Sequence, residues 1–456
     1  MNIKLTSLGL AALLLTTACS DDRTELINTG HEITFHTSVS RAANLTTANL
    51  TDFQVWAFSS ASYAPFIEGL KATKNDNNVF TLPYSIYWPS EFDVLDFWAF
   101  APSPTVSISD TETKQLYTPV LNKTTKIITI SDFKPYTAKQ ESGENGVLAT
   151  KDQLDLIIAG KTAEKKDGSN GIPLTFKHAL SQIVIKAQRG EADGNHHNVE
   201  VKGAWIVNAK GTGTLTIHPN FVDKKIQDNY TFNWTLDANT PTIYGSEFTD
   251  AIPLTTESQA LLIDVDKNNV SRKTSLLLLP HNGEGQSVSA WTPSGNAANG
   301  SSQAYILILC RVEAVHSGEL PATGDGLTED KWVYSNTEAK THSHQLFPTP
   351  DGGAWDKDAY GYTCVPVDIN WEPGKRYEYN LTFCGLNSGA GIYPPEGSTT
   401  NKPGLLPTNE KYITGRPKGK NAGDPVLDNP ISFTVTVSDW VEAKDNGWTG
   451  GNVNMN

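Results

Sequence analysis

The chain has 456 residues, 38% of them hydrophobic, and a formal net charge of −14 at pH 7. This acidic balance disfavours binding to nucleic acids or to anionic membrane surfaces, which requires basic patches. The length predicts two or three domains with enough apolar residues for sizeable cores.

The N-terminus is typical of a secretory signal. A basic start precedes a short apolar run over residues 5–15, which is too brief to span a bilayer as a resident helix. The small residues before Cys19 resemble a bacterial lipobox, although Thr16 stands where that motif usually has leucine. We predict a lipoprotein signal peptide over residues 1–18 and acylation of Cys19, which would anchor the chain to a membrane. An ordinary signal peptide with a chance cysteine is the alternative.

A strand with alternating side chains follows. Its apolar face carries Ile33, Phe35, Thr37 and Val39. Arg41 comes directly afterwards and is followed by the small residues 42–44. We expect such a stretch of small residues to be accessible to a protease, which would suit a cleavage site.

The rest of the chain has the texture of a β protein. Short runs rich in Thr, Val, Ile and aromatic residues alternate with clusters of Gly, Pro, Asn and Asp. No segment shows the sustained apolar period of a long amphipathic helix. Strands are predicted at Phe53–Phe58, Asp96–Phe100, Asp155–Ala159, Leu174–Phe176, Gln182–Ala187, Thr214–His218, Tyr305–Val312, Tyr377–Phe383 and Ile431–Val437. This pattern favours antiparallel sandwiches over βαβ units.

Two polar, glycine-bearing stretches divide the chain. Residues 188–198 separate two strand-rich halves, and residues 385–430 separate the body from one last strand. We therefore predict an N-terminal β-sandwich domain over residues 31–190 and a C-terminal one over residues 191–456. The last strand carries Ile431, Phe433, Val435 and Val437 on one face.

Signatures of chemistry are weak. The sequence has no GxSxG, P-loop or HExxH motif, so we expect no enzyme, no catalytic residues and no cofactor. The pairs His196-His197 and His342-x-His344 lie in loop-like sequence without carboxylates at ligand spacing. Solvated loop histidines are favoured there, and no metal site is expected.

Cysteine and tryptophan leave alternatives open. Cys310, Cys364 and Cys384 remain once Cys19 is acylated, and either one disulfide or three free buried thiols is consistent with this number. Most tryptophans adjoin predicted strands, where core packing is expected. Those in loops, which would serve contact with a sugar, are Trp291, Trp355 and Trp448.

Several stretches in order resemble one family. They are Ile33–Phe35 with Ser40–Ala42, Phe53–Phe58, Tyr87–Pro89, Leu95–Pro102, Asp155–Ala159, Leu174–Ile183, Leu278–Pro280, Trp371–Tyr377 and Ile431–Trp440. Each is unspecific alone, but the ordered set resembles the fimbrillin-like proteins, the type V pilins and fimbrial subunit lipoproteins of Bacteroidetes. The resemblance covers nearly the whole chain after the signal.

The resemblance implies an all-β fold of two tandem transthyretin-like antiparallel β-sandwich domains. It also implies a lipidated pro-segment over residues 19–41 that carries a removable first strand, with cleavage after Arg41. A strand from the next subunit would then fill the emptied groove. The stretch Ser20-Asp21-Asp22 resembles the acidic tag that directs such lipoproteins to the outer face of the outer membrane.

The two ends of the chain suit such an exchange. The series Ile431, Phe433, Val435 and Val437 repeats the spacing of the first strand, with Val435 in place of Thr37. A groove shaped for one strand could therefore accept the other, with ladder hydrogen bonds for affinity and alternate side chains for register. The alternative is that both are ordinary sandwich strands, and the donor could involve other residues near 431–440 or the polar stretch 441–456.

The expected function is a structural subunit of a cell-surface fimbria that contributes to adhesion. Its expected partners are other fimbrial subunits, the outer membrane through Cys19 before processing, and a surface glycan or protein. An uncleaved fimbrial anchor or accessory lipoprotein and a monomeric surface glycan-binding lipoprotein are the alternatives. Nucleic acid is not an expected partner.

Overall fold

The computed structural model describes residues 30–39, 50–107, 113–135, 154–190, 196–227, 229–239, 241–261, 275–293, 302–318, 333–336, 340–348, 358–395, 412–413, 419–427 and 429–440. Strands dominate this part of the chain, and its helical content is the 3₁₀ helix η2 (Lys165–Asn170). The all-β prediction is confirmed.

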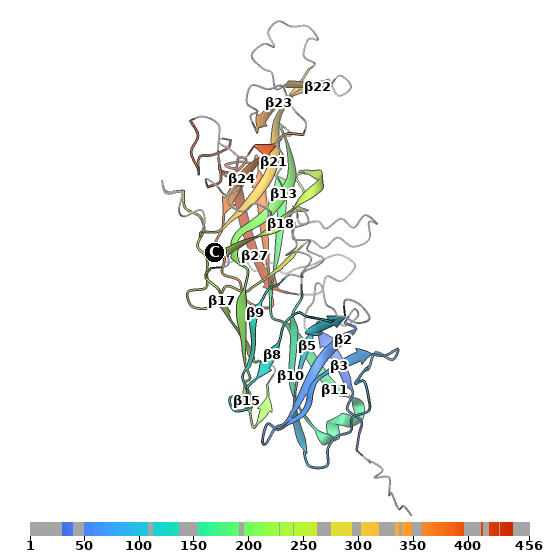
Figure 1. The fold of residues 1–456 in the computed structure, drawn as a ribbon. Helices are drawn as coiled ribbons and strands as arrows, with labels where there is room; N and C mark the ends of the chain where they lie inside the picture. Colours follow the sequence, from blue (N-terminus) through green and yellow to red (C-terminus); the bar gives the residue numbers. More distant parts are fainter. Residues whose placement is uncertain are drawn as a thin grey trace, which may run out of the picture.

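Seven strands close into a barrel at one end of the elongated molecule (Figure 1). In order around the barrel they are β1 (Phe35–Val39), β11 (Ile172–His178), β10 (Ile157–Glu164), β5 (Val94–Ala101), β2 (Asp52–Ser59), β3 (Pro65–Lys74) and β4 (Phe80–Thr81). The neighbours are antiparallel except for β1 and β11, which run parallel. Apolar side chains, which alternate along each strand, fill the interior of the closed barrel. Among them are Phe35, Phe53, Phe97 and Phe176.

Two larger sheets form the other end. The first holds β18 (Pro241–Pro253), β13 (His197–Lys210), β21 (Tyr305–Ser317), β23 (Thr341–Phe347), β22 (Val333–Asn336), β24 (Tyr360–Pro366) and β26 (Tyr412–Ile413). The second holds β19 (Gln259–Ala260), β20 (Leu276–Leu278), β12 (Ser181–Arg189), β25 (Lys375–Phe383) and β27 (Ser432–Asp439). Side chains of both sheets share one core, in which Ile185 of β12 and Leu381 of β25 join Ile206 and Ile308. This is the packing of a sandwich.

A four-stranded sheet runs from the barrel toward the sandwich (Figure 1). Its strands are β17 (Thr231–Leu236), β14 (Gly213–His218), β9 (Ile128–Phe133) and β8 (Pro119–Leu121), and the short pairs β15 (Phe221–Val222) with β16 (Lys225–Ile226) and β6 (Thr105–Ser107) with β7 (Thr113–Gln115) complete the fold. Its apolar side packs on Trp98 and Ile158 from the barrel and on Leu277 from the sandwich. The barrel and the sandwich are therefore joined by a continuous core.

The chain passes from barrel to sandwich between β11 and β12. β11 is a barrel strand, whereas β12, which begins at Ser181, lies in the sheet of β25 and β27. The four-stranded sheet mixes β9 with the later strands β14 and β17. The division at residues 190 and 191 and the tandem transthyretin-like arrangement stay predictions.

A paired first strand and an exposed last strand as the candidate functional site

β1 is paired on both sides. Along one edge Phe35 to Val39 lie in parallel register with Ile172 to Phe176 of β11. Along the other edge Phe35 pairs with Phe80 of β4. The approach to β1 is also paired, since the Ile33 amide donates to the Ile86 carbonyl at 2.7 Å. β1 therefore closes the barrel.

The apolar face of β1 points into the barrel core. Ile33 is 1% exposed, Phe35 is fully buried, Val39 is 8% exposed and Thr37 is half-buried. The Phe35 ring meets the rings of Phe53 and Phe97 edge-on, with centroids 5.7 and 5.8 Å away. Three buried side chains at roughly 1.5–3 kcal/mol each contribute about 5–9 kcal/mol, an upper estimate. Loss of β1 would forfeit this burial and leave two strand edges unpaired.

Gly171 lets the backbone before β11 approach β1 closely. Its φ is +78°, and a Cβ at this position would stand 2.7 Å from Cδ2 of His36. The adjacent Ile172 amide donates to the Thr34 carbonyl at 2.8 Å. Only glycine combines this backbone conformation with so small a volume. The residue lies in a polar turn cluster of the sequence, where nothing marks it as a neighbour of β1.

β27 is an edge strand with exposed apolar side chains. Within the described part of the chain it pairs with β25 alone, antiparallel, from Thr382↔Ser432 to Lys375↔Asp439. Phe433 is 39% exposed and Val435 is 42% exposed, whereas Ile431 is buried and Val437 is half-buried against the sandwich core. An edge strand that exposes a large aromatic ring to solvent is a template for association.

The two strands thus differ in burial at matched positions. Phe35 in β1 is fully buried, whereas Phe433, its counterpart in β27, is 39% exposed. The barrel therefore buries a phenylalanine ring at the place of β1, whereas the matching phenylalanine of β27 is not buried in its own subunit.

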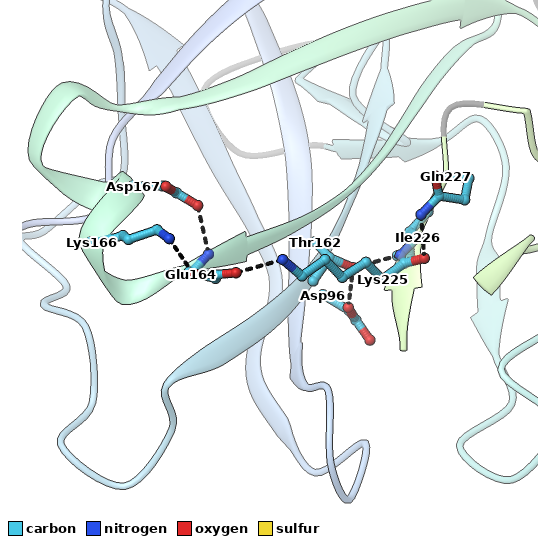
Figure 2. A network of polar contacts seen from close by, with 8 residues as sticks. All are labelled: Asp96, Thr162, Glu164, Lys166, Asp167, Lys225, Ile226 and Gln227. Atoms are coloured by element: carbon cyan, nitrogen blue, oxygen red, sulfur yellow. Dashed lines mark hydrogen bonds and ion pairs between the residues drawn. The ribbon is translucent and has the colours of Figure 1, made fainter. Parts of the chain in front are cut away.

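A polar network braces the barrel where β10 meets β5 and β16 (Figure 2). Lys166 and Lys225 both reach the carboxylate of Glu164 at the end of β10, Lys166 at 2.7 Å. Hydrogen bonds first from Lys166 and then from Lys225 lower the pKa of Glu164 to about 2. The carboxylate therefore stays ionised throughout the physiological range.

A second, buried part of the network involves Thr162 and Asp96. The Ile226 amide donates to Oγ1 of Thr162 at 2.7 Å, and Thr162 donates to Oδ1 of the buried Asp96 (Figure 2). Burial raises the pKa of Asp96, while hydrogen bonds from Thr162 and Ser60 oppose that shift. These contacts hold β5, β10 and β16 together without any contribution from β1.

Three sequence predictions need correction. His196 precedes β13, but His197 is the first residue of that strand rather than a loop residue. His342 and His344 lie in β23 rather than in a loop, and pairing with β21 brings His316 beside them, with ring centroids 5.1–5.3 Å apart. Trp291 is 4% exposed and packs near Tyr305, so it offers no surface to a sugar. Strand pairing and tertiary packing decide these outcomes.

The structure also bears on the cysteines. Those described, Cys310, Cys364 and Cys384, are buried free thiols, which decides between the two alternatives. Burial raises the pKa of Cys310 and of Cys364. Within the described ranges no group of three or more His, Cys, Asp or Glu residues could hold a metal ion. No helix found there is long and apolar enough to cross a membrane.

Other predicted residues lie outside the described part of the chain. They are Cys19 with the signal segment, Arg41 with the stretch that follows it, Trp355 and Trp448. Acylation of Cys19 and cleavage after Arg41 stay predictions, as do the roles assigned to β1 and β27.

Comparison with known proteins decides the family. A fimbrillin-like family model matches residues 40–289, which is more than half of the chain. The chain belongs to the fimbrillin-like family. The recognition made from the ordered sequence stretches is confirmed.

Solved structures resemble this fimbrillin-like chain at low sequence identity. A fimbrial protein from Bacteroides vulgatus is 14% identical, covers 89% of this chain and 99% of its own, and has a TM-score of 0.48. A proposed cell adhesion protein from Bacteroides ovatus is 10% identical, covers 91% and 99%, and has a TM-score of 0.37. No curated protein is similar enough in sequence to match.

Proposed function

We propose that this fimbrillin-like protein is a non-catalytic structural subunit of a cell-surface fimbria. It is exported as a lipoprotein acylated at Cys19, reaches the outer membrane surface, and is cleaved after Arg41. Departure of β1 then opens a groove between β11 and β4, and a strand of the next subunit, β27, fills that groove. The polymer contributes to adhesion.

The difference in burial between Phe35 and Phe433 carries this proposal. Phe35 is fully buried in the barrel, and Phe433 is 39% exposed on an edge strand with the same alternation. Exchange would transfer Phe433 into the place of Phe35, so the assembled state would bury apolar surface that the single subunit leaves in water. Strand addition of this kind supplies ladder hydrogen bonds and side-chain pockets together.

The polar network supports the same mechanism. Because Glu164, Thr162 and Asp96 brace β5 and β10 without β1, the barrel would keep most of its frame when β1 leaves. β5 and β10 would therefore stay in place while a replacement strand enters. Preorganisation of this kind lowers the entropic cost of binding.

The test is N-terminal sequencing and intact mass of the protein recovered from its native cell surface. The proposal predicts an N-terminus at Ala42 in high-mass, detergent-resistant ladders. Arg41→Ala should abolish the ladders, and Arg23→Ala, which changes the other arginine of the N-terminal segment, should leave them intact. A lipid-bearing Cys19 on a monomer in all three proteins would contradict the proposal and leave an anchor or a monomeric surface lipoprotein.

A further inference from the structure

β11 depends on β1 for most of its pairing. It aligns with β1 at five positions, from Phe35↔Ile172 to Val39↔Phe176. It aligns with β10 at only two, Ile157↔His178 and Ile158↔Lys177, both at its C-terminal end. Departure of β1 would therefore leave β11 held by its buried side chains and by the last two residues of the strand.

His178, the last residue of β11, contacts the end of β27. Its ring stacks on the ring of Trp440, with centroids 3.9 Å apart and planes at 19°. Its Nδ1 lies 2.8 Å from Oδ1 of Asp155, which precedes β10, and the side chains of His178 and Asp155 are 1% and 3% exposed. The imidazole is thus fixed from one side and offers its face to Trp440.

Trp440 in turn holds the C-terminal end of β27. It directly follows the strand, is 1% exposed, and donates its amide to the Gly374 carbonyl at 3.1 Å. The neighbouring Asp439 accepts from Lys375 at 2.8 Å. Toward its other end β27 has the exposed Phe433 and Val435. The contact of Trp440 with the barrel therefore adds one anchor to the ladder with β25 and the buried Ile431.

The stack of His178 on Trp440 contains polar atoms that lack hydrogen bonds in the described structure. Nε2 of His178 and Nε1 of Trp440 are both buried and have no hydrogen-bond partner among the described residues. A buried donor or acceptor without a partner costs free energy. Both residues also line a cavity of about 560 Å³ at the junction of barrel and sandwich, which leaves space for the rings to separate. The stack is suited to opening.

We propose that Trp440 on His178 is a latch that couples release of β27 to departure of β1 in the same subunit. While β1 is in place, β11 holds His178 against Trp440 and β27 stays on β25. When β1 leaves, β11 keeps its strand pairing only at Lys177 and His178, so its hold on the stack weakens, the stack opens, and β27 becomes available as a donor. The proposal rests on the proposed strand exchange, and it explains how an unprocessed subunit keeps its donor strand out of the reaction.

Hydrogen–deuterium exchange of the full chain tests the latch. Phe35→Ala weakens β1, and Trp440→Leu removes the stack. We expect each change to speed exchange of the β27 amides by roughly threefold to tenfold, the size expected for an aromatic contact. In the double variant the two effects should not multiply, because they open the same contact.

The control is Trp205→Leu, since Trp205 is equally buried but lies in another cluster with Tyr362. It should leave β27 exchange at the wild-type rate. If Trp440→Leu fails to fold, His178→Leu replaces it with the same expectation. Faster exchange in β1 and β11 of Phe35→Ala with unchanged exchange in β27 would overturn the latch, as would fully multiplicative effects.

A separate assay keeps the latch distinct from the proposed function. Processed wild-type subunits are scored for detergent-resistant ladders alongside the exchange measurement. Ladders with uncoupled β27 exchange would overturn the latch and leave strand exchange standing. Coupled exchange without ladders would support the latch and contradict polymerisation.

Discussion

Phe433→Ala should cost assembly far more than it costs the single subunit. A fully buried phenylalanine contributes roughly 1.5–3 kcal/mol. Since Phe433 is 39% exposed, about three fifths of that, roughly 1–2 kcal/mol, is at stake in the monomer. In the place of Phe35, which is fully buried against Phe53 and Phe97, truncation should cost roughly 3–5 kcal/mol.

The difference of about 2–3 kcal/mol corresponds to a polymerisation constant lowered roughly 30- to 150-fold. Urea unfolding measures the loss in the monomer, and the concentration dependence of ladder formation by processed subunits measures the loss in the polymer. Thr434→Ala is the matched control, because Thr434 is the next residue, is exposed and lies on the opposite face of β27. Equal losses in monomer and polymer would refute the reasoning, as would normal ladders from Phe433→Ala.

Three further changes test the geometry around β1 and the barrel. Gly171→Ala should destabilise β1 by about 1–3 kcal/mol, because the new Cβ would clash with His36 and the alanine would hold a strained φ. Gly285→Ala is the control for the strained φ alone, since Gly285 has φ +69° and open space around it. Equal losses of stability in thermal unfolding would contradict the predicted clash with His36. Because the folded pKa of Asp96 is raised above 3.8, the folded state binds more protons and loses stability as the pH rises through that pKa. Asp96→Asn keeps an oxygen acceptor for Thr162 and Ser60 but cannot ionise. The dependence of the denaturant midpoint on pH should therefore become flatter from about pH 4 upward. An unchanged pH dependence would contradict the assignment of this stability loss to Asp96. Iodoacetamide should label none of Cys310, Cys364 and Cys384 in the native protein and all three in urea, since the thiols are buried; native labelling detected by mass spectrometry would contradict their burial.

Local patterns in the sequence predict where strands lie but not which strands pair with one another. Alternation at Ile33 to Val39 and at Ile431 to Val437 identifies both terminal strands, because a pleated strand with one apolar face imposes a period of two. It does not show that β1 lies parallel to β11, or that β27 lies at an edge with Phe433 exposed. Pairing between distant segments depends on closure of the whole sheet, which no local period records.

The same limit applies to the functional residues. The sequence places Gly171 in a turn cluster and His178 just after a predicted strand. In the structure Gly171 lies against β1 and His178 stacks on Trp440, which follows it by 262 residues in the chain. His316 joins His342 and His344 only through the register of β21 with β23. The buried network of Asp96 and Thr162 is likewise a contact between separate strands. Such residues become recognisable only once the sheets are assembled.

An engineered disulfide tests most directly whether β27 of one subunit replaces β1 of the next. Ser38 faces Thr175 across the β1–β11 ladder, with Oγ and Oγ1 3.2 Å apart. In the alignment of Ile431 with Ile33, Thr436 takes the place of Ser38. Processed subunits that carry Thr175→Cys and Thr436→Cys should therefore form a covalent ladder on oxidation, since adjacent strands place such pairs within disulfide range. Thr175→Cys with Thr434→Cys, two residues out of register, should give none. A ladder from both pairs or from neither would contradict the exchange.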